Sequence, residues 1–291
     1  FCLAGWQAVT ETRSPAEAAS TPGDDVIAAA AALEIFHAAA LVHDDIIDAS
    51  DTRRGRPTVH RAFAATHRES DWQGESDRFG ESMAILIGDL ALAWADDLAA
   101  AVPARIAPVW ARMRTEVLSG QVLDIANEAA RDESLAAAER VIAYKTAGYT
   151  VARPLELGAV LGGADESLVA QLRIIGMQLG LAFQLRDDLL GVYGDPAVTG
   201  KPSGDDLITG KRTVLIAEGL ARADDDAAAR LRRLLGTDVS RGELADAREI
   251  LTVSGAQGAV EARIESALGS ALGGIDALPT SPPARAKLTA L

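Results

Sequence analysis

Apolar residues recur along most of the chain at intervals of three and four, which is the spacing of one face of an α-helix. Prolines and glycines fall between these blocks, where they end helices or form turns. Alternating strand patterns are nearly absent, so the pattern predicts one all-α bundle with a short last helix. The longer helices are expected over residues 25–49, 81–101, 104–129, 133–147, 150–163, 165–192, 212–222, 226–236, 241–253 and 256–273.

The polar stretches between these blocks are short. The three longest cover residues 12–25, 65–80 and 194–211, and none is long enough to separate two domains. The sequence also has no internal repeat of fixed period. We therefore expect a single domain over residues 1–291.

The most apolar run, residues 26–42, is interrupted by Glu34 and His37. A membrane-spanning helix needs about 20 mostly uncharged residues, so this run predicts a buried helix and no membrane span. Hydrophobic residues make up 48% of the chain, enough for a large core. The net charge of −14 argues against nucleic-acid binding, which needs a basic face. Cys2 is the one cysteine, so no internal disulfide forms and a cytoplasmic location is expected.

Candidate chemistry begins in the stretch LVHDDIIDASDTRRGRP, residues 41–57. Asp44 and Asp48 are four residues apart, so on a helix their carboxylates lie on one face, about one turn apart. They repel each other unless a cation lies between them, and oxygen ligands of this kind suit Mg²⁺. Asp45 points to the flank. For an isolated pair of this kind, a solvated helix end is an equally good explanation.

Three arginines follow directly and change this balance. Arg53, Arg54 and Arg56 lie in a turn that contains Gly55 and Pro57. Guanidinium groups bind phosphate oxygens through two parallel hydrogen bonds. Metal-binding acids beside arginines therefore predict a site for a diphosphate.

A second acidic cluster ends another long helix, in AFQLRDDLLGVYGD, residues 182–195. The position four residues after Asp187 is Gly191 instead of an acid. This cluster, with Asp187 and Asp188, is therefore one ligand weaker than the first unless Asp195 compensates. Acidic ends that face each other across a bundle can hold a cluster of Mg²⁺ ions.

Lysine is rare in this chain, which has four: Lys145, Lys201, Lys211 and Lys287. Lys145 lies in YKTAGYT, and the next two lie in the glycine-rich TGKPSGDDLITGK after the second acidic cluster. The lysine ammonium is a compact charge suited to phosphate. A single lysine of this kind is usually a solvated surface charge. Here three of the four lysines lie within motif-like segments, and this clustering favours phosphate binding.

Together these segments strongly resemble the trans-polyprenyl diphosphate synthases, the family that makes geranyl, farnesyl, geranylgeranyl and longer diphosphates. The two signatures are HDDIIDASDTRRGRPTVH, residues 43–60, and FQLRDDLLGVYGDPAVTGKPSGDDLITGKRT, residues 183–213. LSGQVLDI and YKTAGYT follow between them in the family's order. The resemblance covers nearly the whole chain. It implies an all-α, isoprenoid-synthase-type helical bundle with a central apolar cavity.

The resemblance implies an Mg²⁺-dependent, head-to-tail condensation of isopentenyl diphosphate with an allylic diphosphate. Ionisation of the allylic C–O bond would give a cation that the second double bond attacks, and the departing diphosphate would take the proton. Water has to be kept out, and residues 199–211 would form a lid. A homodimer through the helices near 81–129 is also implied. Three Mg²⁺ ions per active site would be bound by Asp44, Asp48, Asp187 and Asp188.

The remaining motif residues have implied roles in substrate binding. Arg53 would hold the allylic diphosphate, and Arg54 with His37 would hold isopentenyl diphosphate. Gln121 and Asp124 would line the same cavity. The allylic diphosphate and the reacting group would be surrounded by Lys145, Thr146, Gln184, Lys201 and Lys211. The catalytic set would be Asp44, Asp48, Arg53, Lys145, Asp187 and Lys201.

The sequence departs from the family pattern in three places. The family has a basic Gly-Lys-x-x-Arg-Pro segment upstream of the point where this sequence begins, and FCLAGW resembles its continuation. Half of the isopentenyl diphosphate site is therefore expected to lie outside these residues. Gly191 stands where the second motif ends in an acid. One extra residue separates Lys201 from Lys211 compared with some farnesyl-type members, which leaves the register of Lys211 open.

Product length depends on the helix that leads to Asp44. Ala40 and Ala39 lie four and five residues before it, and Phe36 lies eight before it on the same face. In the family, bulk at the nearer positions stops chain growth early. The alanines therefore argue against a C15 product, and Phe36 favours geranylgeranyl diphosphate, C20. An ordinary core role for Phe36 stays open, as do C15 products and products above C20.

Two other classes of protein are weighed against this interpretation. A terpene cyclase or squalene-type synthase shares the fold and the acidic motifs, but does not need the paired arginines and Gly-Lys loops in this order. A non-catalytic subunit of a prenyl synthase is the second. Gly191 and the expected upstream segment keep that alternative open.

Overall fold

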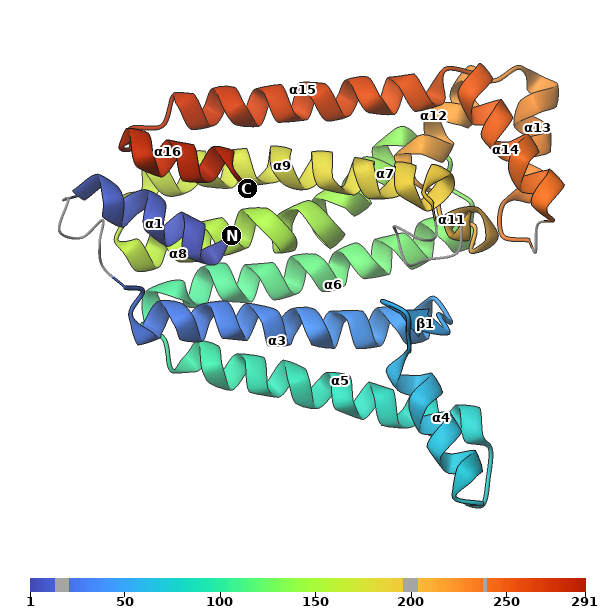
Figure 1. The fold of residues 1–291 in the computed structure, drawn as a ribbon, viewed down its shortest axis with the longest axis horizontal. Helices are drawn as coiled ribbons and strands as arrows, with labels where there is room; N and C mark the ends of the chain where they lie inside the picture. Colours follow the sequence, from blue (N-terminus) through green and yellow to red (C-terminus); the bar gives the residue numbers. More distant parts are fainter. Residues whose placement is uncertain (14–20, 196–203, 238–239) are drawn as a thin grey trace. The chain divides into compact units, whose positions relative to one another are not determined.

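The computed structural model describes residues 1–13, 21–195, 204–237 and 240–291. Nearly all of this part of the chain is helical (Figure 1), which confirms the all-α fold. The helices are α1 (Cys2–Arg13), α3 (Asp24–Ile47), α4 (Val59–Glu69), α5 (Ser76–Ala100), η1 (Ala104–Ile106), α6 (Ala107–Ala130), α7 (Leu135–Val141), η2 (Ile142–Ala152), α8 (Arg153–Gly162), α9 (Glu166–Tyr193), α11 (Asp205–Ile208), α12 (Val214–Arg222), α13 (Asp225–Leu234), α14 (Arg241–Val253), α15 (Ala256–Asp276) and α16 (Pro282–Thr289).

The chain forms two compact units, and each is described by itself. Among the described residues, the larger unit contains 1–13, 21–22, 105–195, 204–237 and 240–291, and the smaller unit contains 23–104. The expectation of a single domain stays a prediction.

The smaller unit is built on α3 and α5, which run side by side (Figure 1). The buried residues of α5 are all glycine or alanine, and half of those on α3 are alanine, so the two backbones approach closely. At Gly88 of α5 an added Cβ would lie 2.1 Å from Nε2 of His43. His43 Nε2 also lies 3.2 Å from the carbonyl oxygen of Ile85. This contact fixes the end of α3 that carries the first acidic cluster.

A small hairpin follows α3 and was not predicted from the sequence. β1 (Thr52–Arg53) pairs antiparallel with β2 (Arg56–Pro57), with Arg53 opposite Arg56. The two turn residues, Arg54 and Gly55, have φ of 52° and 73°, as a tight two-residue hairpin turn requires. For Arg54 this left-handed conformation costs roughly 1–2 kcal/mol. Thr58 Oγ1 donates to the Ser50 carbonyl at 2.8 Å and closes the base of the hairpin.

In the larger unit, η2 packs against both α6 and α9. An added Cβ at Gly120 of α6 would lie 2.4 Å from the backbone nitrogen of Lys145. One at Gly180 of α9 would lie 2.5 Å from Cα of Ala147. The sequence predicted a break near residue 148, but α7, η2 and α8 are continuous, because the widened π-helical turns of η2 carry the chain through. Such turns often mark functional positions.

A buried ion-pair network holds the far end of η2. The guanidinium of Arg153 donates to both carboxylate oxygens of Glu116, at 2.9 and 2.7 Å, and also to Glu156. Arg153 is 8% exposed and Glu156 is 5% exposed, so neither charge could remain there without its partner. The network therefore fixes α6 relative to η2 and α8.

Two helices, α3 and α9, are long and apolar enough to cross a membrane by length and composition alone. Core helices of soluble proteins meet the same criterion, so this is weak evidence. The expectation of no membrane span stays a prediction.

The close contact at Gly120 gives a direct test of this packing. Gly120→Ala should lower the free energy of unfolding by about 1–3 kcal/mol, because the new Cβ meets backbone atoms that cannot move aside. Urea unfolding followed by circular dichroism measures this. Gly269→Ala on α15 is the control, since no atom lies within 4 Å of its Cβ. The control should gain up to about 1 kcal/mol from helix propensity. Equal stability of the two variants would contradict the contact.

Candidate active site

The carboxyl end of α3 carries Asp44 and Asp48. The Asp48 backbone N–H donates to the Asp44 carbonyl at 2.8 Å, so the predicted helical spacing of the two residues is retained although Asp48 caps the helix. Both side chains are half-buried. They form an acidic end on the smaller unit.

Asp45 has a different environment from its neighbours, since it is 4% exposed. Its Oδ1 accepts a hydrogen bond from Nε of Arg53 at 2.8 Å and forms an ion pair with Nη2 at 2.7 Å. Nη2 also lies 3.6 Å from Oδ2 of Asp44. Burial alone would lower the pKa of Arg53, but the hydrogen bond and charge of Asp45, with Asp44 and Asp48, raise it. Arg53 is therefore held firmly in its charged form beside the acidic end.

The other predicted residues of this unit lie along α3 and in the hairpin turn. His37 is half-buried, and burial is the main cause of its lowered pKa, to which Arg54 and Arg53 also contribute. The imidazole is therefore neutral near pH 7. Arg54 is exposed. Phe36 and Ala39 are buried, at 2% and 0% exposure. Both a chain-length role and a core role require burial, so this observation does not distinguish them. Ala40 is half-buried.

In the larger unit, α6 and η2 bring two predicted residues into contact. Nζ of Lys145 donates to Oδ2 of Asp124 at 2.6 Å, and each side chain is about one-fifth exposed. Gln121 and Thr146 beside them are half-buried. The backbone contacts at Gly120 and Gly180 determine where this pair lies.

The second acidic cluster lies about two turns further along α9 from Gly180. Asp187 is exposed, whereas Asp188 is 4% exposed and accepts a hydrogen bond from Gln184 Nε2 at 2.8 Å. Burial, with repulsion from Asp206 and Asp187, raises the pKa of Asp188 to about 8, although Gln184 and Lys211 act in the opposite direction. Metal binding by either aspartate stays a prediction.

Asp206 is a residue that the sequence interpretation missed. An added Cβ at Gly191 would lie 2.0 Å from its Oδ2, so this carboxylate lies where a side chain at the fifth motif position would be. The segment is held there because Gly204 N–H donates to the Gly191 carbonyl at 3.0 Å, with Gly204 at φ 85°. The Lys211 N–H donates to the Asp206 carbonyl at 2.9 Å, and the Lys211 side chain is half-buried. Lys201 and the other residues of the expected lid over 199–203 lie outside the described residues.

The donor chemistry of these ends suits Mg²⁺. Among the described residues, no group of three or more His, Cys, Asp or Glu side chains is arranged to hold a metal ion. Mg²⁺ needs fewer, because it keeps several waters and uses one or two carboxylates together with substrate phosphates. Asp44 and Asp48 supply such a pair, so the smaller unit fits an Mg²⁺ ion that is bound together with a diphosphate.

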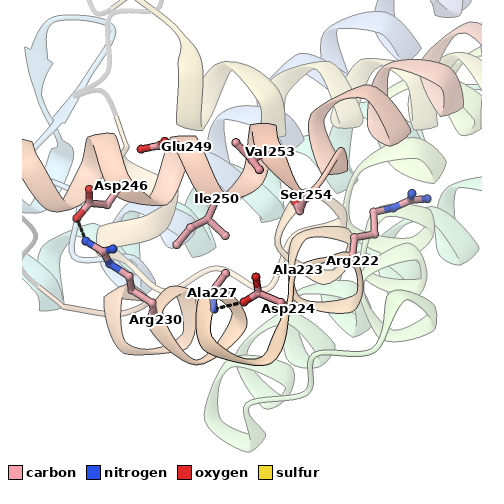
Figure 2. A pocket seen from close by; sticks show the side chains of 10 residues that line it. All are labelled: Arg222, Ala223, Asp224, Ala227, Arg230, Asp246, Glu249, Ile250, Val253 and Ser254. Carbon is pink, nitrogen blue, oxygen red and sulfur yellow. Dashed lines mark hydrogen bonds and ion pairs between the residues drawn. The ribbon is translucent and has the colours of Figure 1, made fainter.

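A separate cavity of about 410 Å³ lies in the larger unit, between α12, α13 and α14 (Figure 2). Arg222 and Arg230 in its wall are outnumbered by Asp224, Asp246 and Glu249, and Arg230 is paired with Asp246. This mixture does not favour a diphosphate. None of the predicted site residues lines the cavity, whose wall is formed by Arg222, Ala223, Asp224, Ala227, Arg230, Asp246, Glu249, Ile250, Val253 and Ser254.

Comparison with known proteins places these motifs in a family. Residues 6–251 match the polyprenyl synthetase family. The chain is 34% identical over 266 residues to geranylgeranyl diphosphate synthase of Mycobacterium tuberculosis, over 87% of this chain and 71% of that protein. It is 33% identical over 240 residues to a short chain isoprenyl diphosphate synthase of Methanocaldococcus jannaschii, over 79% and 67%.

A solved structure is similar over nearly the whole chain. Geranylgeranyl pyrophosphate synthase from Corynebacterium glutamicum, complexed with isoprenyl diphosphate and magnesium, is 44% identical with a TM-score of 0.93. The similarity covers 99% of this chain and 83% of that one. The chain belongs to the polyprenyl synthetase family. It is a trans-prenyltransferase, and the resemblance inferred from its motifs is confirmed.

The position of Asp206 over Gly191 predicts a coupling between the two residues. Gly191→Asp should lower the free energy of unfolding by about 1–3 kcal/mol, because it forces a second carboxylate onto the first. The double variant Gly191→Asp/Asp206→Ala should recover most of this loss. Urea unfolding in metal-free buffer measures all three proteins, with Asp206→Ala as the matched single variant. Additive effects of the two changes would contradict the coupling.

Proposed function

We propose that this protein catalyses the Mg²⁺-dependent, head-to-tail condensation of isopentenyl diphosphate with an allylic diphosphate, with geranylgeranyl diphosphate as the main product. The observation that carries the proposal is Arg53 held beside the Asp44 and Asp48 pair. Together they provide a fixed cation for phosphate and a carboxylate pair for a metal, which a diphosphate leaving group needs. Membership of the polyprenyl synthetase family supports the same reaction.

In this proposal the two acidic ends act on one pair of substrates. Asp44, Asp48, Asp187 and Asp188 would hold three Mg²⁺ ions, which would supply neutralisation of the charge on the leaving diphosphate. Arg53 binds the allylic diphosphate. Arg54 and the neutral His37 bind isopentenyl diphosphate by charge and by hydrogen bonding respectively. The strained turn conformation of Arg54 supports a functional reason for an arginine at that position.

Lysines complete the charge compensation, and the central apolar cavity that the family resemblance implies would exclude water. Lys145, oriented by Asp124, and Lys211 and Lys201 donate to the allylic diphosphate, with Thr146, Gln184 and Gln121 beside the reacting group. A carbocation survives only where water is kept out. The departing diphosphate takes the proton, so no protein nucleophile or base is required.

A homodimer in the cytoplasm is part of the proposal. Exposed apolar side chains lie four residues apart on α5, at Leu86, Leu90 and Trp94. On α6 they recur at Leu118, Val122 and Ile125. Each helix thus has an apolar stripe that a second copy of the chain would cover.

The reaction is tested by incubating the protein with Mg²⁺, isopentenyl diphosphate and each of dimethylallyl, geranyl and farnesyl diphosphate, and then sizing the products. We expect elongation to C20, abolished by EDTA. Asp44→Ala and Asp187→Ala should each lower kcat at least about a hundredfold, because each removes charge stabilisation of the leaving group. Asp276→Ala, an exposed acid at the end of α15, is the matched control and should retain full activity. Failure to elongate any primer would favour a non-catalytic subunit, and cyclic products would favour a cyclase.

Product length is tested on α3. Phe36→Ala should shift the products beyond C20, because it removes the bulk two turns before Asp44, and Ala40→Phe should shift them towards C15. Phe36→Ala leaves a cavity that lowers the free energy of unfolding by about 3–5 kcal/mol, which could prevent folding. Ala40→Phe leaves no such cavity and tests the assignment in that case. Ile27→Ala, an exposed position on the same helix, is the control. Unchanged product lengths in both test variants would assign Phe36 to the core alone.

A further inference from the structure

The three aspartates of the first motif do not occupy equivalent positions. Asp44 and Asp48 share one face of α3, whereas Asp45 is turned by about 100° from Asp44 because successive residues of a helix are so spaced. Asp45 is 4% exposed, and its neighbours are half-buried. An ion with a shell of water and phosphate oxygens needs an open carboxylate, and Asp45 does not provide one.

Asp45 instead makes the closest contacts to Arg53. Its Oδ1 receives a hydrogen bond from Nε at 2.8 Å and lies 2.7 Å from Nη2 in an ion pair. Because a guanidinium has five N–H groups, its contacts with this one oxygen leave other N–H groups for another acceptor. The two contacts also fix the plane of the guanidinium, so the remaining N–H groups are aimed in a set direction.

The surroundings of Arg53 make this contact important. Arg53 lies in a strand of only two residues, whose hairpin has a strained turn at Arg54 and is closed by Thr58 on the Ser50 carbonyl. Such a short hairpin does not position a long side chain by itself. The buried carboxylate of Asp45 therefore supplies the precision that the hairpin lacks.

We infer that Asp45 is a positioning residue that holds Arg53 in the orientation needed to bind the allylic diphosphate, and that it is not a metal ligand. This role rests on the proposed function, in which Arg53 binds that diphosphate. It separates the acids of the motif into two kinds. Loss of Asp44 impairs the response to Mg²⁺, whereas loss of Asp45 impairs binding of one of the two substrates.

The test compares Asp45→Asn, Asp45→Ala, Arg53→Gln and Asp44→Asn in the full chain. Asp45→Asn should raise KM for the allylic substrate by about ten- to a hundredfold, the effect of weakening a charged hydrogen bond. KM for isopentenyl diphosphate and the Mg²⁺ concentration for half-maximal rate should change less than about twofold. The double variant Asp45→Asn/Arg53→Gln should be no worse than Arg53→Gln alone, since both changes remove one interaction.

A binding measurement gives a readout other than activity. Calorimetric titration with an unreactive allylic thiolodiphosphate should show the same loss of affinity in Asp45→Asn, with and without Mg²⁺. Thermal melting in the same buffer identifies a purely structural role. In that case the melting temperature of Asp45→Asn falls, but its affinity for the thiolodiphosphate is retained. That outcome overturns the inference, as does a raised Mg²⁺ requirement equal to that of Asp44→Asn. If the wild-type protein itself neither binds the analogue nor elongates a primer, the proposed function fails first.

Discussion

Carboxylates at the carboxyl ends of helices are the constraint on which this structure depends. The last turn of a helix carries partial negative charge, so acids are disfavoured there. Asp44 and Asp45 nevertheless lie in the last turn of α3, which ends at Ile47. Asp187 and Asp188 lie near the end of α9. The protein offsets part of this repulsion with Arg53 and Gln184. The concentrated negative charge at each helix end also attracts a cation from solution. The repulsion that destabilises these helix ends therefore favours metal binding.

Small residues determine where these ends lie. Gly88 admits the ring of His43, which directly precedes Asp44, and Gly120 admits the backbone at Lys145. Helices in backbone contact cannot slide or rotate without a clash, so the functional side chains inherit fixed positions. The abundant alanine and glycine in the sequence therefore have a consequence beyond helix propensity. Because these small residues let the helices pack closely, they fix the positions of the side chains at the acidic ends.

The sequence predicted the long helices well, because their apolar spacing is regular: 165–192 was expected and Glu166–Tyr193 was found. It missed α4, whose buried face is formed by His60, Ala64 and His67 and so reads as polar. The π-helical turns of η2 leave no mark on apolar spacing. The motif residues could be named from a resemblance. The contacts of Asp45 with Arg53 and of Asp206 over Gly191 could not, since both depend on how loops fold back.

The two aspartate doublets follow one rule that neither motif shows alone. In each, the second aspartate is 4% exposed and accepts a hydrogen bond from a protein donor, Arg53 for Asp45 and Gln184 for Asp188. The first is more open in both cases. Because adjacent residues on a helix point about 100° apart, the two carboxylates of a doublet face different surroundings. A doublet thus supplies one outward acid and one inward acid, and the inward acid orders the side chain that binds it.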